Sequence, residues 1–146
     1  MSLARYQVST DVRVVSDLSM DLTSILGSDN FALILSRSAA LNSSLVPAIE
    51  EFAPKAKVLV SPVESEPSVK WLESHFQTFS QSQLDQVVAI GGGSCIDAAK
   101  VLAAASVHRG DASIYELTKN HPQATRATPK IVAIPTTAGT GSEVTS

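Results

Sequence analysis

Four short, largely apolar runs constrain the fold of this chain more than any other feature of its sequence. They are Phe31–Leu35, Lys57–Val60, Gln86–Ile90 and Ile131–Ile134. A continuous apolar run of this length is typical of a strand that is buried on both faces, as the strands of parallel sheets are. Parallel strands need crossover connections, and these are usually helices. The four runs therefore predict a parallel sheet whose faces are covered by helices.

Helical patterns fill two of the gaps between these runs. Ser43 or Ser44 can cap a helix that extends to about Phe52, with Pro47 in its first turn, where a missing N–H costs nothing. Pro67 suits the first position of a second helix. That helix carries apolar side chains at helical spacing, namely Val69, Leu72, Phe76 and Phe79. Helices at these places are the crossover connections that a parallel sheet requires.

A third helix is expected from Ser94 to about His108, where small apolar residues can pack closely on a sheet. His108 and Arg109 would complement the negative end of its dipole, and Gly110 would stop it. Before the first run, Gln7–Val15 alternates in part and predicts an edge strand or hairpin. The predicted fold is thus α/β, a Rossmann-like parallel sheet with helices on both faces, preceded by a short N-terminal β-hairpin. Ligands of such sheets bind at the edge where the strands end.

The composition excludes several classes of protein. With 146 residues, of which 44% are hydrophobic and 17% charged, the chain suits one globular domain. Its net charge is −3 and its basic residues are scattered, which argues against a nucleic-acid surface. A single cysteine, Cys95, excludes an internal disulfide and suits a small buried helix residue better than a reactive thiol. We find no signal peptide and no apolar run of about 20 residues, so we expect a cytoplasmic protein without a membrane segment.

The third run leads directly into Gly91, Gly92, Gly93 and Ser94, and then into a helix. Glycines without β-carbons let the backbone turn sharply and approach a ligand closely. The free N–H groups and the positive end of the following helix favour an anion, and a diphosphate suits both features. This pattern is neither G-x-G-x-x-G nor a P-loop. A tight turn that binds no ligand is the alternative, but three glycines after a buried strand favour phosphate binding.

The fourth run is followed by a segment rich in hydroxyls and glycine, from Pro135 to Ser146. Its threonines and serines offer many neutral donors and acceptors with little bulk, which suits a ribose, a diphosphate and a carboxamide. A polar loop that ends in a helix cap fits the same residues. On its own this segment leaves both interpretations open.

Together the two segments resemble the iron-containing (group III) alcohol dehydrogenases. The matching motifs are G-G-G-S-x-x-D-x-A-K at Gly91–Lys100 and P-T-T-A-G-T-G-S-E-V-T at Pro135–Thr145, and Glu66-Pro67-Ser68 matches a similar turn. The resemblance implies a dehydroquinate synthase-like N-terminal domain over 1–146 that binds a dinucleotide. It also implies that the C-terminal helical domain, which holds the metal, is absent from this chain. The final residues, Glu143–Ser146, look like the opening of a helix and suggest a fragment.

By this resemblance, Gly92, Gly93 and Ser94 would lie against the diphosphate of the cofactor. It places Thr136 and Thr137 near the diphosphate and ribose. It also implies that Asp97 faces the nicotinamide from the first turn of the helix. The nicotinamide side of the cleft would be lined by Thr140, Ser142 and Thr145. Lys100 belongs to the motif and suits a structural role equally well.

The choice of cofactor depends on the segment after the first run. Many members of the resembled family carry an Asp there, which would bind the ribose of NAD, whereas this chain has Ser36 and Arg37. A guanidinium pairs well with a phosphate, so Arg37 favours NADP over NAD. The family's metal, Fe²⁺ or Zn²⁺, is held by one Asp and three His of the C-terminal domain. His75, His108 and His121 lack ligand spacing, and we expect surface roles for them and no metal site in this chain.

The predicted function is an NAD(P)-dependent oxidoreductase that transfers a hydride reversibly between a nicotinamide cofactor and a small alcohol or aldehyde. The metal of the full-length enzyme would act as a Lewis acid on the substrate oxygen. Two alternatives remain: a truncated, non-catalytic dinucleotide-binding module, and a relative similar to dehydroquinate synthase or glycerol dehydrogenase. Full-length family members are expected to be homo-oligomers.

Overall fold

The computed structural model describes residues 11, 13–14, 16–26, 29–63, 65–108, 113–120, 127–139 and 141. Its centre is a four-stranded sheet in the order β2-β1-β3-β4, and every neighbouring pair is parallel. The strands are β1 (Phe31–Ser36), β2 (Val58–Val63), β3 (Gln86–Gly91) and β4 (Lys130–Pro135). Each predicted run therefore forms a strand, and the prediction of a parallel sheet is confirmed.

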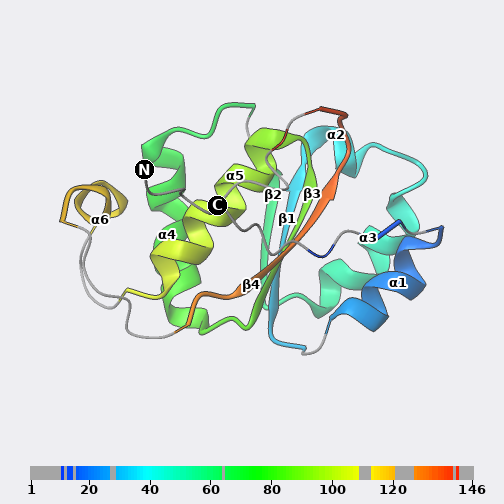
Figure 1. Ribbon diagram of the computed structural model, residues 1–146, viewed down its shortest axis with the longest axis horizontal. Coiled ribbons are helices and arrows are strands. Elements are labelled where there is room, and N and C mark those ends of the chain that lie inside the picture. The colour runs from blue at the N-terminus through cyan, green and yellow to red at the C-terminus, as the bar shows by residue number, and fades with distance from the viewer. Residues whose placement is uncertain are drawn as a thin grey trace, which may run out of the picture.

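Helices cover both faces of this sheet, which makes three layers (Figure 1). On one face lie α4 (Val69–Ser82) and α5 (Gly93–Ser106), and on the other lie α1 (Leu18–Ile25) and α3 (Val46–Phe52). The shorter elements are α2 (Arg37–Ala40), the 3₁₀ helix η1 (Ala53–Lys55) and α6 (Ile114–Asn120), which packs outside α4.

The sheet divides the apolar interior into two cores. Successive side chains of a strand point to opposite faces, so Ala32 and Ile34 of β1 pack in the core with α4 and α5. Phe31 and Leu33 pack in the other core, with Leu22 of α1. Both β1 and β3 are buried along their length, whereas β4 is the partly buried edge strand of the described sheet. The two buried strands are therefore the rigid centre on which the loops at their ends are held.

The predicted cap of α3 is wrong. Neither Ser43 nor Ser44 caps this helix, which begins at Val46 without a side-chain cap. The backbone N–H and the hydroxyl of Ser44 instead donate to Asn42 Oδ1, at 3.0 and 2.7 Å. Pro47 does lie in the first turn, as expected.

The start of α4 also differs from the prediction. Pro67 does not occupy the first helical position, because the hydroxyl of Ser68 caps the helix by accepting the N–H of Trp71 at 3.2 Å. The helix therefore begins one residue after Ser68, and Pro67 precedes the cap. A side-chain cap thus fixes this helix start two residues later than the proline suggested.

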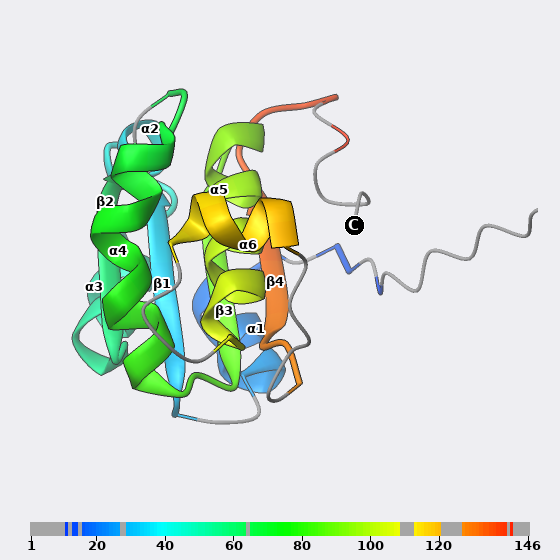
Figure 2. The ribbon, with the colours of Figure 1, turned by 90° about the vertical axis from the view of Figure 1, so that its left-hand side faces the viewer.

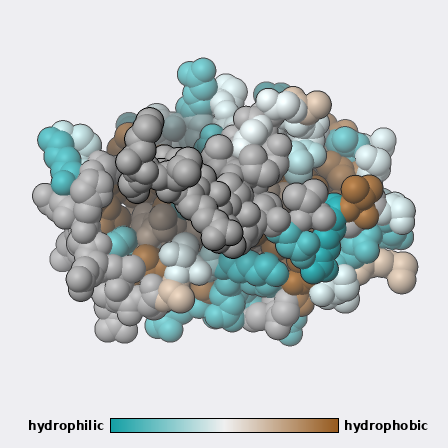
Figure 3. Space-filling model, viewed as in Figure 1, coloured by the Kyte–Doolittle hydropathy of each residue, from teal (hydrophilic) through white to brown (hydrophobic). Residues whose placement is uncertain are grey.

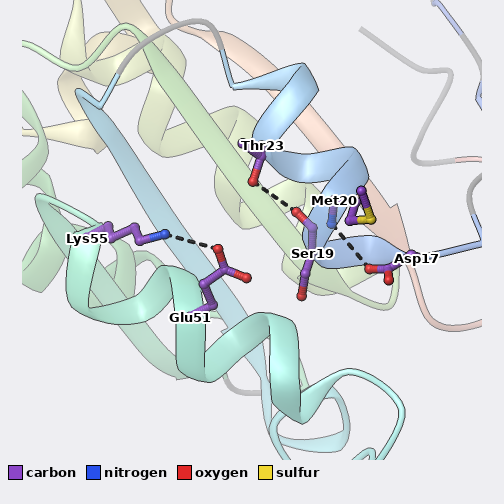
Figure 4. A network of polar contacts seen from close by, with 6 residues as sticks. All are labelled: Asp17, Ser19, Met20, Thr23, Glu51 and Lys55. Atoms are coloured by element: carbon purple, nitrogen blue, oxygen red, sulfur yellow. Dashed lines mark hydrogen bonds and ion pairs between the residues drawn. The ribbon is translucent and has the colours of Figure 1, made fainter.

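Helix α1 was not predicted. Asp17 caps it by accepting the N–H of Met20 at 3.2 Å (Figure 4). Leu22 on this helix is buried. On the neighbouring helical segment, Lys55 pairs with Glu51 at 3.1 Å (Figure 4). Most of the predicted hairpin, Gln7–Val15, lies outside the described residues, and residues 11, 13 and 14, which are described, form no strand.

The predicted third helix ends earlier than expected. Helix α5 stops at Ser106 with Val107 as its C-cap, and Arg109 and Gly110 lie outside the described residues. The unpredicted helix α6 begins with a reciprocal cap: the N–H of Ser113 donates to Glu116 Oε2 at 2.9 Å and the N–H of Glu116 donates to Ser113 Oγ at 3.1 Å.

Exposed apolar side chains are scattered over the described surface. Figure 3 shows small separate hydrophobic areas among hydrophilic ones on one face. The large apolar side chains that are exposed are Val14, Met20, Leu41, Leu59, Val69, Val101 and Tyr115. Among the described residues, no helix has the length and apolar character that crossing a membrane requires.

Candidate functional site

The order of the strands creates a crevice between the ends of β1 and β3. From β1 the chain continues to β2 on one side of the sheet, and from β3 it continues to β4 on the other side. Ligands of parallel α/β sheets bind at such a switch point, outside the carboxyl ends of the strands. Helix α2 and the first turn of α5 both lie at this end (Figure 2).

A pocket of about 950 Å³ occupies this edge, which is large enough for a cofactor. It is lined by Ser36, Arg37, Ser38, Leu41, Val63, Ser65, Glu66, Gly92, Gly93, Ser94, Cys95 and Thr137. The structure thus brings together six residues that the sequence proposed for the site, from the loops after β1, β3 and β4.

The N-terminus of α5 opens into this pocket without a side-chain cap. Its N-cap is Gly92, whereas α1, α2 and α4 are each capped by an Asp or Ser side chain. The N–H groups of Cys95 and Ile96 donate to the carbonyl of Gly92, at 3.0 and 3.2 Å. The N–H groups of Gly93 and Ser94 precede them and have no acceptor within the helix, so they are available to an anion.

The three glycines have different roles. A β-carbon on Gly91 would lie 2.7 Å from Cys95 Cβ and 2.8 Å from Ser36 Cβ, so this glycine is required by the packing of α5 on β1. A β-carbon on Gly92 would meet Thr137 Oγ1 at 3.2 Å. The first glycine therefore serves the fold, whereas Gly92 and Gly93 line the pocket.

The loop after β1 presents a fixed pair of hydroxyls beside a cation. Ser36 Oγ accepts the N–H of Ala39 at 3.1 Å, which caps α2, and lies 3.0 Å from Ser38 Oγ. Arg37 is exposed at the start of α2, and it forms no ion pair with any residue that the structure describes. Its guanidinium is thus free to meet a ligand in the pocket.

The loop after β4 is held against the glycine turn. The N–H of Thr136 donates to Gly91 O at 3.0 Å, which continues the β3–β4 pairing beyond Pro135. Thr137 lines the pocket, whereas Thr136 does not. The hydroxyl oxygen of Thr136 is buried and has no hydrogen-bond partner among the described residues. A buried hydroxyl of this kind is one that a bound ligand or water satisfies.

Asp97 lies farther from the pocket than the sequence suggested. Because α5 begins at Gly93, Asp97 is in the second turn and not the first, and it does not line the pocket. Its carboxylate lies 3.7 Å from Lys100 Nζ, which gives Lys100 a structural contact on the same helix. Three further predicted residues, Thr140, Ser142 and Thr145, lie outside the described residues.

Sequence reasoning missed several lining residues from the loops after β1 and β2. They are Leu41, Val63, Ser65 and Glu66. A signal was present for Glu66, which stands in the quoted Glu66-Pro67-Ser68 turn. Its place among the lining residues depends on the pairing of β2 with β1, which the sequence pattern does not specify.

Cys95 forms part of the pocket floor as an inert group. Its side chain is 2% exposed, and its Sγ lies 3.6 Å from Ile90 O and 3.7 Å from Ile34 O. Burial raises the pKa of the thiol to about 12, although the N–H of Ser36 works in the other direction. The interpretation of Cys95 as a small buried helix residue agrees with this placement.

The described residues contain no group of three or more His, Cys, Asp or Glu side chains that could hold a metal ion. His75 is half-buried and not a surface residue as expected, because its ring contacts Trp71 with centroids 4.4 Å apart. This burial lowers the pKa of His75. His108 is also partly buried, and His121 lies outside the described residues.

The fold and the pocket define a class: α/β domains in which an uncapped helix N-terminus meets a crevice at the switch point of a parallel sheet. A family model, iron-containing alcohol dehydrogenase, matches residues 11–146. The chain belongs to this family, and its fold is that of the family's N-terminal domain.

Individual relatives agree with this assignment. The long-chain-alcohol dehydrogenase 1 of Geobacillus thermodenitrificans is 40% identical over 85 residues, which are 58% of this chain and 21% of that protein. The NADH-dependent butanol dehydrogenase A of Clostridium acetobutylicum is 35% identical over 85 residues, with the same coverage of 58% and 21%. A crystal structure of an iron-containing alcohol dehydrogenase matches 99% of this chain and 40% of its own, with a TM-score of 0.75 and 27% identity. The chain thus spans about a fifth of the length of these curated relatives.

Proposed function

We propose that this chain is the dinucleotide-binding domain of an alcohol dehydrogenase that transfers a hydride reversibly between a nicotinamide cofactor and an alcohol or aldehyde. The observation that carries the proposal is the uncapped N-terminus of α5, which opens into a cofactor-sized pocket at the switch point. Family membership and the name of the NADH-dependent relative support it. The remaining wall of the active site would come from the C-terminal domain of a full-length protein.

Each segment of the pocket has a role in this proposal. The N–H groups of Gly93 and Ser94, with the Ser94 hydroxyl, bind the diphosphate at the positive end of the helix dipole. Thr136 and Thr137 bind the diphosphate and ribose region. Asp97 faces the nicotinamide half of the cofactor from one turn further along α5. When it is bound, the nicotinamide supplies the hydride acceptor or donor.

The segment that follows Thr137 would contact the nicotinamide half of the cofactor. We assign Thr140, Ser142 and Thr145 to the lining of the cleft on that side. The iron for which the family is named needs ligands beyond the described residues, which offer no suitable group. We therefore derive no step of the reaction through it.

The cofactor that we propose is NADP or NAD, with NADP favoured by Arg37. The guanidinium lines the pocket without an ion-pair partner among the described residues, beside the hydroxyls of Ser36 and Ser38. A 2′-phosphate on the adenosine ribose would accept hydrogen bonds from all three groups. NAD would bind the same pocket without this contact.

A second candidate is a dinucleotide-binding module without catalysis. It needs only the pocket at the switch point, which the described residues form. In this case the chain binds the cofactor but turns over no alcohol. Both candidates share the same cofactor site, so the test of binding applies to both.

Titration of the ¹⁵N-labelled chain with NAD⁺ and NADP⁺, followed by NMR, tests the site directly. We expect saturable shifts of the amide signals of Gly92, Gly93 and Ser94, because their N–H groups lie at the proposed diphosphate position. The amides of α3, on the other face of the sheet, serve as the internal control. Saturable shifts confined to α3, or no saturable shifts at all, would overturn the proposal.

A further inference from the structure

We propose, on the basis of the proposed function, that Glu66 is a second determinant of cofactor choice and acts in opposition to Arg37. The carboxylate of Glu66 favours an adenosine ribose with a free 2′-hydroxyl, whereas Arg37 favours a 2′-phosphate. The two side chains together make this a site for both cofactors, and the ratio of the two affinities depends on their opposite charges.

Strand pairing places the two residues at one end of the pocket. Ser36 at the end of β1 is the register partner of Val63 at the end of β2. Arg37 follows Ser36 directly, and Glu66 lies three residues after Val63. Because β2 lies beside β1 on the side away from β3, Glu66 follows a strand on one side of β1, whereas the N-terminus of α5 follows β3 on the other side.

The chemistry of this end suits the adenosine half of a dinucleotide. Leu41 is 76% exposed and lines the pocket with Val63, so both can contact a purine ring. The hydroxyls of Ser36, Ser38 and Ser65 line the same end. With the diphosphate on Gly93 and Ser94, a ribose would lie between that helix N-terminus and this apolar surface.

Arg37 and Glu66 are the charged residues among those that line the pocket. Both are exposed, and within the described part of the chain neither forms an ion pair. Each charge therefore remains available to a ligand. A carboxylate accepts hydrogen bonds from ribose hydroxyls and repels a phosphate. A guanidinium donates hydrogen bonds to a phosphate and attracts its negative charge.

Neutralising Glu66 and neutralising Arg37 should therefore shift the preference between the two forms of the ribose in opposite directions. The test uses calorimetric titration of the 146-residue chain with ADP and with 2′-phospho-ADP, which carry the adenosine end without the nicotinamide. Glu66→Gln should shift the ratio of the two dissociation constants toward the phosphorylated ligand by about fivefold or more, since one ligand loses a charge-assisted hydrogen bond and the other loses a repulsion. Arg37→Gln should shift it by a similar factor toward ADP.

The matched control is Glu50→Gln, which removes the same charge from the exposed surface of α3, on the other face of the sheet. It should leave the ratio unchanged. An unchanged ratio in Glu66→Gln, with both ligands still bound by the wild type, would overturn the role of Glu66 while the proposed function stands. A shift equal to that of Glu50→Gln would overturn it too, because the effect would then be one of net charge. If neither ligand, nor NAD⁺ or NADP⁺, binds to the wild type, the proposed function itself fails.

Discussion

Gly91 and Cys95 meet where the first turn of α5 packs on the end of β1. Their contact shows that a glycine motif can serve two purposes within three residues. The first glycine lacks a β-carbon that would collide with Cys95 and Ser36, and the next two line the pocket. The sequence motif alone does not separate these roles, because both require a residue without a side chain.

Gly91→Ala should destabilise the fold more than Gly92→Ala does. The added methyl group would lie 2.7 and 2.8 Å from two other β-carbons, so backbone must move, at a cost of roughly 1–3 kcal/mol of unfolding free energy. At Gly92 the nearest atom is the hydroxyl of Thr137 at 3.2 Å, which can rotate away. Urea denaturation of both variants measures the difference. Equal midpoints for the wild type and Gly91→Ala would contradict this account of the contact.

At the scale of elements, α5 begins at the pocket without a side-chain cap, whereas α1, α2 and α4 each have one. Helix α3 also lacks a side-chain cap, but it lies on the other face of the sheet. Helix α4 shows the usual alternative, in which the Ser68 hydroxyl satisfies the N–H of Trp71. An open helix start in a pocket is a place where a ligand supplies the cap. The contrast between these two neighbouring helices is a structural reason to locate an anion at α5 and not at α4.

Ser68→Ala should cost about 1 kcal/mol of unfolding free energy, because the first turn of α4 loses its side-chain cap. Ser74→Ala is the matched control, since the Ser74 hydroxyl only donates to Trp71 O within the exposed part of the same helix. Chemical denaturation of the two variants gives both values. If Ser74→Ala proved as costly as Ser68→Ala, the assignment of the cap would be wrong.

The strands were predictable because each of them is a continuous apolar run. This is the pattern of a strand that is buried on both faces of a parallel sheet. Helix starts were less predictable, since a proline is compatible with several early positions and the cap that forms decides between them. The sequence at the start of helix α6 does contain an indication of a helix start, the Ser113 to Glu116 spacing of a capping box. Helix α1 carried a weaker one, with Asp17 before Leu18 and Leu22. Both helices are short, and their stability depends on the layers beneath them.

For the molecule as a whole, the order of the strands turns separate loops into one site. The glycine turn and Arg37 could be proposed from local sequence, because each follows a strand that the sequence pattern identified. Glu66 could not, because it joins the site only when β2 pairs with β1. The sequence pattern does not specify long-range strand pairing. A lining residue that depends on this pairing could therefore be identified only from the structure.

We propose that the N-terminus of α5 binds the diphosphate of a nicotinamide cofactor. Calorimetric titration of Gly93→Val with the cofactor that the wild type prefers tests this directly. Ala104→Val is the control, since it adds bulk to an exposed position of the same helix. Gly93→Val should lose affinity by about tenfold or more, because the side chain keeps the diphosphate from the N–H groups, while Ala104→Val should bind like the wild type. Unchanged affinity in a folded Gly93→Val would contradict the claim.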